Sequence, residues 1–344
     1  MPDETNGITA AQRKPIRIFR AESMIHTPFD KVRDPSPILT NADISFVDQP
    51  DNAHLIIARR HKFLKEFGDY DKVFAVWTHE PAMSIDSDPI VQIPGIRNPV
   101  HVMNACTGDI YADEFYDFCK IKPDFDTAMR AFAAKPKRAV MLATYRNPKI
   151  QLFWDGVDRD LNHYRQNLAL YLKDRGFCDI YGRRWPAHID ITGNSREGNW
   201  RESKQEILLN YAVNIAFENA VISKYITEKI WEAIVCACLP VYHGARNGIY
   251  RIFPKNSFIE ADGKSVEDLG DEILAMPQDE MTARYEMCLR AYLAIYREDR
   301  RLLSRRACHL RTLDFLHAAV LAHDLSSDTN RIQTLQPSSL RDRK

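Results

Sequence analysis

The stretch FENAVISKYITEK combines four side chains that could hold a charged ligand around one turn: Glu218, Asn219, Glu228 and Lys229. Glu218 and Asn219 end a strand-like segment. Thr227 is a good N-cap residue, so Glu228 and Lys229 should lie in the first turn of a helix. The N–H groups and dipole of a helix N-terminus, with a lysine beside them, suit a diphosphate, and the glutamate could accept hydrogen bonds from ribose hydroxyls. The pattern predicts a nucleotide-sugar site. The alternative is an exposed cap with an incidental ion pair.

Two other ways of binding a nucleotide have little support. The sequence contains neither G-x-G-x-x-G nor G-x-x-x-x-G-K-[ST], which argues against a dinucleotide oxidoreductase and a P-loop NTPase. The chain has 47 basic and 47 acidic residues, and this balance argues against a general nucleic-acid binder. No apolar run reaches the roughly 18 residues of a transmembrane helix, and no signal peptide is recognisable at the start.

The seven cysteines are scattered and mostly embedded in apolar sequence, as expected of small core residues in a reducing compartment. Cys236 and Cys238 form C-x-C inside what reads as a buried helix, which is not a zinc spacing. These features predict a cytoplasmic protein and leave open a peripheral location at an inner membrane.

The elements that must position the site alternate between strands and helices, which predicts an α/β fold with about two domains in 344 residues. In the first half, strands are expected at IRIFRAE, ISFVD, HLIIAR, KVFAVWTHEP and PVHVMNA, with a helix at RRHKFLKEFG. A basic, proline-bearing linker, AAKPKR, follows. It predicts a first domain over residues 1–134, in which 1–14 are disordered, a second over 135–325, and a polar tail over 326–344.

The second half reads as a Rossmann-like β-α-β-α-β unit. Strands are expected at AVMLATY, FCDIYG, VNIAFEN and LPVYHG. LNHYRQNLALYLKDRG has helical spacing with Gly176 as its end, and TEKIWEAIVCAC is a second helix. Because ligands of parallel α/β sheets bind beyond the carboxyl ends of the strands, Glu218 and Asn219 lie at the expected place.

The segment from Phe217 to Asp262 resembles the donor-site signature of glycosyltransferase family 10, the α-1,3/1,4-fucosyltransferases, in its bacterial type. F-E-N is followed by an aromatic residue six positions after the asparagine and then by I-T-E-K, while PVYHG and FPKNSFI fit downstream. A weaker resemblance extends upstream to about residue 70. The resemblance implies a GT-B fold, in which two Rossmann-like domains face a central cleft, and transfer of fucose from GDP-fucose with inversion.

The resemblance also implies a role for each matching residue of the donor site. Asn219 would help to hold the donor, Tyr225 would line its site, Glu228 would bind the ribose and Lys229 the pyrophosphate. Arg165, in the helix HYRQNLALYL, resembles the helix arginine that contacts the phosphates, and a bidentate guanidinium suits that role. The alternative for Arg165 is an ordinary surface arginine.

In the first domain, VWTHEP resembles the family segment that carries the general base, which would be Glu80. A carboxylate is needed to take the proton of the acceptor hydroxyl, while Arg165 and Lys229 would stabilise the departing GDP. His79 could orient this base or be an ordinary strand-end histidine. Asp86 to Asp88 reads as a solvated loop. No D-x-D stands where a metal–diphosphate site is expected, so no cofactor is obligatory and a divalent metal would at most stimulate.

The predicted function is therefore inverting transfer of fucose to a glycan hydroxyl, on an oligosaccharide or lipid-linked acceptor such as a lipopolysaccharide-like chain. Neither Glu218 nor Glu228 has a glutamate eight positions later, which favours inversion over the E-x7-E of retaining enzymes. The segments YHGARNGIY and EADGKS depart from the family pattern. Two alternatives therefore stay open: a donor that is another GDP-sugar, and a non-catalytic homologue that binds a nucleotide or a glycan. The basic segment Arg297 to Arg311 is either a solvated helix face or a contact with an anionic membrane.

Overall fold

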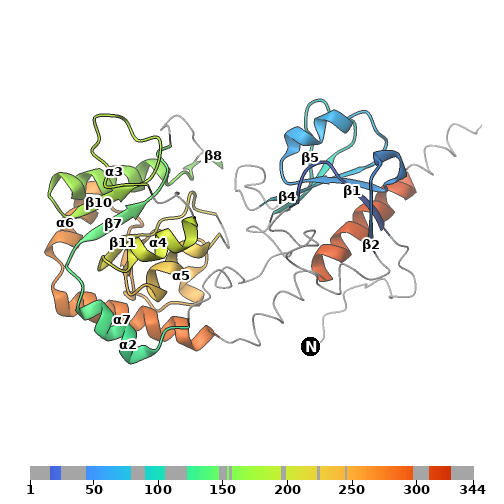
Figure 1. Ribbon diagram of the computed structural model, residues 1–344. Coiled ribbons are helices and arrows are strands. Elements are labelled where there is room, and N and C mark those ends of the chain that lie inside the picture. The colour runs from blue at the N-terminus through green and yellow to red at the C-terminus, as the bar shows by residue number, and fades with distance from the viewer. Residues whose placement is uncertain are drawn as a thin grey trace, which may run out of the picture. The chain divides into compact units, whose positions relative to one another are not determined.

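The structure is a computed structural model of the 344-residue chain (Figure 1). It describes residues 16–24, 44–78, 90–104, 122–146, 153–154, 157–194, 199–222, 225–244, 246–296 and 310–326. Contacts divide the chain into two compact units. The first unit comprises Met1–Ala112 and Ser304–Lys344, and the second unit comprises Asp113–Leu303. The predicted boundary, between residues 134 and 135, differs from this division. Helix α2 (Phe125–Ala133) is grouped with the second unit, and the helical residues 310–326 with the first.

The first unit is built on a six-stranded sheet in the order β2-β1-β3-β4-β6-β5, parallel except for the β5–β6 pair. Its strands are β1 (Ile16–Arg20), β2 (Ile44–Val47), β3 (Leu55–Ala58), β4 (Val73–Thr78), β5 (Ile90–Val91) and β6 (Val100–Asn104). The five strands predicted in this half are all present. Every residue of β3 and β4 is buried, as parallel strands with both faces covered must be.

The helix predicted over residues 59–68 is wrong. The segment forms two 3₁₀ turns, His61–Phe63 and Lys65–Phe67. Leu64 is fully buried, and Phe63 and Phe67 pack against the same core. At Gly68 a Cβ atom would lie 2.0 Å from the carbonyl oxygen of Gly95, so only glycine allows the chain to pass there.

The helix over residues 310–326 contacts the rest of the first unit through polar contacts of His323 and a ring contact of Phe315. His323 Nε2 lies 3.3 Å from the carboxylate of Asp71 and 3.4 Å from the side-chain amide of Asn98. The ring of Phe315 meets that of His101 edge to face at 5.8 Å. The chain therefore returns to its first unit after completing the second.

The second unit holds a five-stranded parallel sheet in the order β10-β7-β11-β12-β13. Its strands are β7 (Ala139–Leu142), β10 (Cys178–Tyr181), β11 (Val213–Ile215), β12 (Leu239–Tyr242) and β13 (Ile259–Glu260), with a small hairpin of β8 (Phe153–Trp154) and β9 (Val157–Asp158). Its helices, besides α2, are α3 (Asn162–Asp174), α4 (Trp200–Leu208), α5 (Glu228–Val235), α6 (Val266–Ala275) and α7 (Gln278–Ile295).

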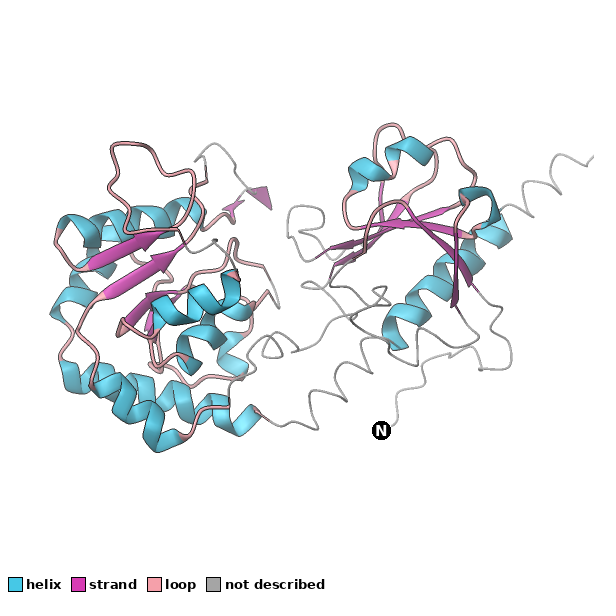
Figure 2. Cartoon of the chain, viewed as in Figure 1, coloured by secondary structure: helices cyan, strands magenta, loops and turns pink. Residues whose placement is uncertain are grey.

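Helices cover both faces of this sheet (Figure 2), which makes the second unit Rossmann-like as predicted. With the mostly parallel sheet of the first unit, it makes a chain of two α/β units. The sequence-based end of α3 is confirmed, because Gly176 follows the helix with a left-handed φ of 69°. Strand β11 is shorter than predicted and stops at Ile215, before the motif F-E-N.

The C-x-C pair does not lie inside a helix as predicted. Helix α5 ends at Val235, Cys236 is its C-cap, and Ala237 has a left-handed φ of 54° that turns the chain into β12. The Lys135 ammonium contributes to this turn by donating to the carbonyls of Leu208 and Ala237, near the ends of α4 and α5. The four cysteines that the structure describes are buried free thiols, which confirms for them the prediction of small core residues.

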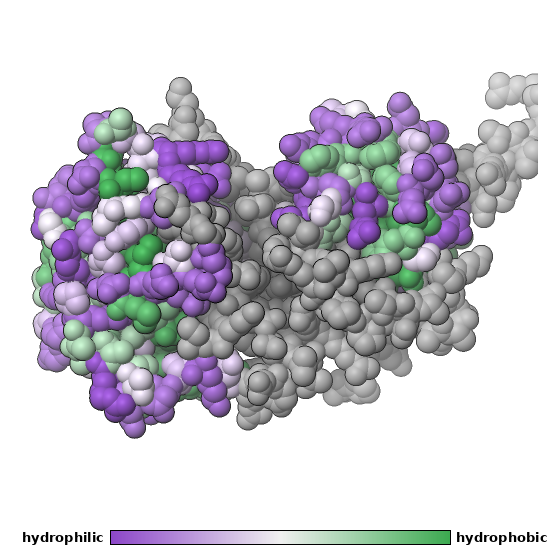
Figure 3. All heavy atoms as spheres, in the orientation of Figure 1, coloured by the Kyte–Doolittle hydropathy of each residue, from purple (hydrophilic) through white to green (hydrophobic). Residues whose placement is uncertain are grey.

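Hydrophilic side chains dominate the described surface of both units in the view of Figure 3, with hydrophobic residues scattered among them. Among the described helices, none combines the length and the apolar character needed to cross a bilayer.

Candidate active site

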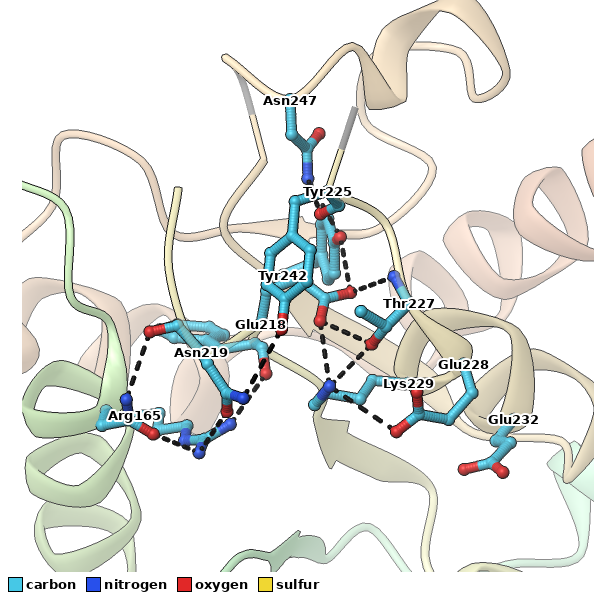
Figure 4. Close-up of polar contacts among 12 residues, drawn as sticks. Arg165, Glu218, Asn219, Tyr225, Thr227, Glu228, Lys229, Glu232, Tyr242 and Asn247 are labelled. Carbon is cyan, nitrogen blue, oxygen red and sulfur yellow. Dashed lines mark hydrogen bonds and ion pairs between the residues drawn. The ribbon is translucent and has the colours of Figure 1, made fainter. Parts of the chain in front are cut away.

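The predicted donor residues gather at the carboxyl edge of the second sheet, next to the point where its strand order reverses. From β7 the chain crosses to β10 on one side, while β11, β12 and β13 follow on the other side. Such a switch point leaves a crevice between the first turns of the neighbouring segments, and it is where open α/β sheets bind ligands. Arg165 on α3 comes from one side of this point, and the segment after β11 from the other (Figure 4).

Glu218 is the centre of the polar network although it is fully buried. Its carboxylate accepts hydrogen bonds from the backbone N–H of Thr227 at 2.7 Å and from the Thr227 hydroxyl at 2.6 Å. The Tyr242 hydroxyl donates to it at 3.1 Å, and the Lys229 ammonium at 3.0 Å. A buried carboxylate is tolerated only when it is paired in this way. Glu218 therefore ties the strand end to the start of α5.

Thr227 precedes α5 as predicted, but it makes no side-chain cap. Its hydroxyl donates to Glu218 and accepts from Lys229 at 2.6 Å instead. The Thr227 side chain therefore makes no hydrogen bond to the N–H groups of the first helical turn. These N–H groups thus keep their capacity to bind an anion.

Lys229 is held by the protein on all sides. Its ammonium contacts Glu218 Oε2 at 3.0 Å, Thr227 Oγ1 at 2.6 Å and Glu228 Oε1 at 3.5 Å. An ammonium has three N–H donors, so these three oxygens can occupy all of them. Burial alone would lower the pKa of Lys229, but the carboxylates of Glu218 and Glu228 outweigh it and the pKa is raised. Lys229 is therefore a firmly charged, fixed cation and not a mobile side chain.

Glu228 lies at the outer side of this network, with about a quarter of its side chain exposed. Burial would raise its pKa, but the nearby ammonium groups of Lys229 and Lys204 lower the pKa to about 2. Lys204 on α4 lies 3.9 Å from Glu228 and also forms an ion pair with buried Glu232. Glu228 is therefore an ionised acceptor at every physiological pH, which is what binding of ribose hydroxyls requires.

The depressed pKa of Glu228 makes a prediction about stability. Its pKa is below the ordinary value of 4.5, so its contribution is present above about pH 4.5 and is lost as the pH falls toward 2. We expect Glu228→Gln to destabilise the second unit by about 1–2 kcal/mol at pH 7, after allowance for solvent screening, and much less at pH 3. Urea unfolding followed at both pH values would measure this.

The matched control is Glu206→Gln, at an exposed glutamate of α4. A difference between wild type and Glu228→Gln that stayed the same at both pH values would show that the carboxylate charge is not the cause.

Arg165 is buried, which rules out the alternative of a surface arginine. One terminal nitrogen donates to the carbonyl of Phe217 at 3.1 Å, and the other to the side-chain oxygens of Asn162 at 2.5 Å and Asn219 at 3.0 Å. Among the residues that the structure describes, no acceptor bonds its buried Nε–H. Burial lowers the pKa of Arg165, although arginine stays protonated in proteins. A buried cation with an unbonded donor is suited to an anionic ligand.

Asn219 and Tyr225 connect the arginine to the rest of the network. The Asn219 side chain accepts from Arg165 through its oxygen and approaches the Tyr225 hydroxyl at 3.5 Å through its nitrogen. Tyr225 is buried, and its carbonyl accepts at 3.2 Å from Asn247, which also donates to the Tyr242 hydroxyl at 3.0 Å. Contacts thus run without a break from Arg165 to Glu228.

The structure brings together all five residues that were predicted to bind the donor. The predicted base Glu80, its neighbour His79 and the Asp86 to Asp88 loop lie outside the described residues, as does most of the basic segment from Arg297 to Arg311. The network also contains Asn162, Tyr242 and Asn247, which were not singled out from the sequence, and Glu218, which was named only as one of the charged side chains around the turn. Only Glu218 carried a signal, because a carboxylate directly after an apolar strand must be paired if it is buried.

Comparison with known proteins finds similarity over the part of the chain that holds this network. The family model for glycosyltransferase family 10 (fucosyltransferase) C-term matches residues 154–313, which include every residue of the network. GDP-fucose protein O-fucosyltransferase 3 of Danio rerio is 33% identical over 115 residues, 28% of this chain and 25% of that protein. The 3-galactosyl-N-acetylglucosaminide 4-alpha-L-fucosyltransferase FUT3 of Pongo pygmaeus is 32% identical over 126 residues, 36% of this chain and 29% of that protein.

The chain therefore spans less than a third of the length of these curated relatives. A crystal structure of an alpha1,3-fucosyltransferase with GDP-fucose is similar over 82% of this chain and 84% of that chain, with 15% sequence identity and a TM-score of 0.44. The family match spans the network from Arg165 to Asn247. The part of the chain that holds the site, residues 154–313, is thus similar to glycosyltransferase family 10.

Proposed function

We propose that this protein is an inverting glycosyltransferase that transfers fucose from GDP-fucose to a hydroxyl group of a glycan. The observation that carries the proposal is the buried Arg165, whose Nε–H bonds no acceptor among the described residues, next to the N-terminus of α5. A guanidinium and a helix N-terminus that come from the two sides of a switch point are suited to a diphosphate. The similar curated proteins are named as fucosyltransferases, one of them for GDP-fucose.

Each residue of the network has a part in holding the donor. Arg165 and the first turn of α5 bind the diphosphate, and Asn219 keeps the guanidinium in place. Glu228 accepts hydrogen bonds from the ribose, since its carboxylate is ionised and partly exposed. Lys229 contributes its charge from a fixed position, because Glu218, Thr227 and Glu228 hold its ammonium. Tyr225, which is buried, lines the donor site and contacts the Asn219 side chain through its hydroxyl.

The reaction is one in-line displacement at the anomeric carbon of fucose. The bond from this carbon to the diphosphate oxygen breaks while the bond to the acceptor oxygen forms. Glu80 removes the proton of the acceptor hydroxyl, as a general base must at neutral pH. The negative charge that develops on GDP is stabilised by Arg165, Lys229 and the dipole of α5. No step in this scheme requires a metal, although a divalent ion could add to the stabilisation of GDP.

The acceptor in this proposal is an oligosaccharide or a lipid-linked glycan, such as a lipopolysaccharide-like chain or one that contains N-acetylglucosamine. A lipid-linked acceptor would bring the protein to a membrane surface on its cytoplasmic side. The chemistry of the donor network does not select among these acceptors, since no acceptor hydroxyl contacts a residue of α3 or α5 in the scheme.

A donor panel tests the proposal. We expect the purified protein to bind GDP and GDP-fucose in calorimetric titrations at least about tenfold more tightly than UDP and UDP-glucose. We also expect slow hydrolysis of GDP-fucose that a mixture of glycan acceptors accelerates. Release of GDP from GDP-mannose but not from GDP-fucose would assign another GDP-sugar. Binding of GDP without turnover of any sugar nucleotide would show a non-catalytic binding protein and overturn the proposal.

A further inference from the structure

Two glutamates lie one turn apart on α5. Glu228 is followed four residues later by Glu232, so both side chains project from the same face of the helix (Figure 4). Glu232 is only 2% exposed. Like charges at this spacing repel each other, and a buried carboxylate without a partner is strongly destabilising. This face of α5 therefore requires a cation.

Lys204 of α4 supplies this cation. Its ammonium forms an ion pair with Glu232 Oε2 and lies 3.9 Å from Glu228 Oε1. Apart from Lys204, no described residue bonds this oxygen of Glu232. The Lys204 side chain is 15% exposed, so solvent screens its charge less than that of a surface lysine. Lys204 thus joins two carboxylates that would otherwise repel each other.

The helix that carries Lys204 is fixed relative to α5. Lys135 donates to the carbonyl of Leu208, the last residue of α4, at 3.1 Å and to that of Ala237, just after α5, at 2.8 Å. The Cys238 thiol also donates to the Leu208 carbonyl, at 3.1 Å. Because the ends of both helices are joined in this way, α4 holds Lys204 at a fixed position beside α5.

Two lysines approach Glu228 at the same oxygen. The ammonium of Lys229 lies 3.5 Å from Oε1 and that of Lys204 lies 3.9 Å from it. Each lysine also has a buried carboxylate of its own, Glu218 for Lys229 and Glu232 for Lys204. In both ion pairs of Glu228 the contacting oxygen is Oε1, and about a quarter of the side chain is exposed. A carboxylate fixed through one oxygen presents the other in a defined direction, with lone pairs for hydroxyl donors.

Removal of Lys204 would act on Glu228 in two ways. It would take away one of the two cations that attract the carboxylate, and it would leave the charge of Glu232 without its partner one turn away. Both changes draw the Glu228 carboxylate toward Lys229 and away from Glu232. The oxygen Oε2 would then turn toward an ammonium and away from a ligand.

We propose that Lys204 is a positioning residue for the sugar-nucleotide donor. Held by Glu232, it keeps the Glu228 carboxylate turned so that Oε2 accepts the hydrogen bonds of the ribose hydroxyls. This inference rests on the proposed function, in which Glu228 binds the ribose of a GDP-sugar. Lys204 itself touches no part of the donor in this scheme. Its loss therefore weakens the ribose contacts and leaves the diphosphate contacts of Arg165 and α5 in place.

The test compares GDP with 2′,3′-dideoxy-GDP, which lacks both ribose hydroxyls, in calorimetric titrations. We expect wild type to bind GDP about tenfold or more tightly than the dideoxy nucleotide, because hydrogen bonds to a charged group are lost. In Lys204→Met this ratio should fall to about twofold, through weaker binding of GDP and unchanged binding of dideoxy-GDP. The KM for hydrolysis of GDP-fucose should rise by the same factor, while kcat stays within about twofold of wild type, as expected when ground-state binding is lost.

A second variant keeps the test decisive if Lys204→Met does not fold, since that change leaves Glu232 buried without its partner. The double variant Lys204→Met with Glu232→Leu removes both charges of the buried ion pair, a replacement that is often neutral for stability. Its preference for GDP over dideoxy-GDP should also fall, to about threefold or less. The matched control is Lys173→Met, at a lysine in the last turn of α3 that lies 3.8 Å from exposed Asp190. It should bind both nucleotides as wild type does.

Four outcomes would contradict these expectations. An equal loss of affinity for both nucleotides in the Lys204 variants would show an effect on the diphosphate or on the fold, which overturns the inference. A folded double variant that keeps the wild-type preference for GDP would also overturn it, because Lys204 would then only neutralise Glu232. Equal binding of both nucleotides by wild type would overturn it and remove Glu228 from the ribose, while leaving a GDP site in place. Absence of any GDP binding to wild type would contradict the proposed function itself.

Discussion

Glu80→Gln is expected to lower the rate of fucosyl transfer by about 10²- to 10⁴-fold, the range that a positioned general base contributes. The amide keeps the size of the side chain and can still hydrogen-bond the acceptor hydroxyl, but it cannot take its proton. Because Glu80 belongs to the first unit and all donor residues to the second, the affinity for GDP should stay the same. Initial rates with GDP-fucose and an active acceptor, together with calorimetric titration of GDP, measure the two quantities separately.

A matched control for this change is Glu66→Gln, at an exposed glutamate of a 3₁₀ turn in the same unit. It should transfer fucose at the wild-type rate. Rates that rise again with pH in Glu80→Gln would be consistent with hydroxide replacing the missing base. Full activity of Glu80→Gln near neutral pH would remove Glu80 from this role, and the base would then have to be another carboxylate.

The sequence predicted best what depends on local pattern. Strands such as β4 are continuous apolar runs with polar ends, and α3 has helical spacing that ends at Gly176, so both could be located from the sequence alone. The five donor residues could be named because they match a family motif at fixed spacing. Their grouping then followed from a general property of parallel sheets, whose carboxyl ends lie at one edge.

What could not be predicted depends on contacts between distant segments. The 3₁₀ turns at residues 61–67 lead into Gly68, whose backbone packs against Gly95 and bonds Arg97, and these contacts with a distant segment cannot be read from local spacing. Glu218 could be noticed, but its partner Tyr242 is an unremarkable residue of an apolar strand until the fold places its hydroxyl at the carboxylate. Arg165 could have been a surface residue, since its burial depends on Phe217 and Asn219, more than 50 positions away.

Arg165→Lys is expected to lower kcat/KM for fucosyl transfer by about 10²- to 10³-fold, the loss seen when one donor to a developing oxyanion is removed. Charge is retained, so the effect comes from geometry. The guanidinium bonds the Phe217 carbonyl and Asn219 with its terminal nitrogens and keeps Nε–H for the ligand. A lysine ammonium, on a shorter and unbranched side chain, cannot hydrogen-bond the Phe217 carbonyl and Asn219 and also a diphosphate. Calorimetry with GDP and steady-state rates with GDP-fucose measure both parts of the loss.

Two further variants separate this geometry from charge and from stability. Arg175→Lys repeats the same substitution at the exposed end of α3 and should leave both measurements unchanged. Lys229→Ala should weaken GDP binding and also lower the melting temperature, because Glu218 loses one of its partners while fully buried. Arg165→Lys should instead lose activity out of proportion to its change in melting temperature. If folded Arg165→Lys transferred fucose at the wild-type rate, the diphosphate would have to be held by Lys229 and α5 without the guanidinium. The ion pairs that hold Lys229 would then have to open on binding.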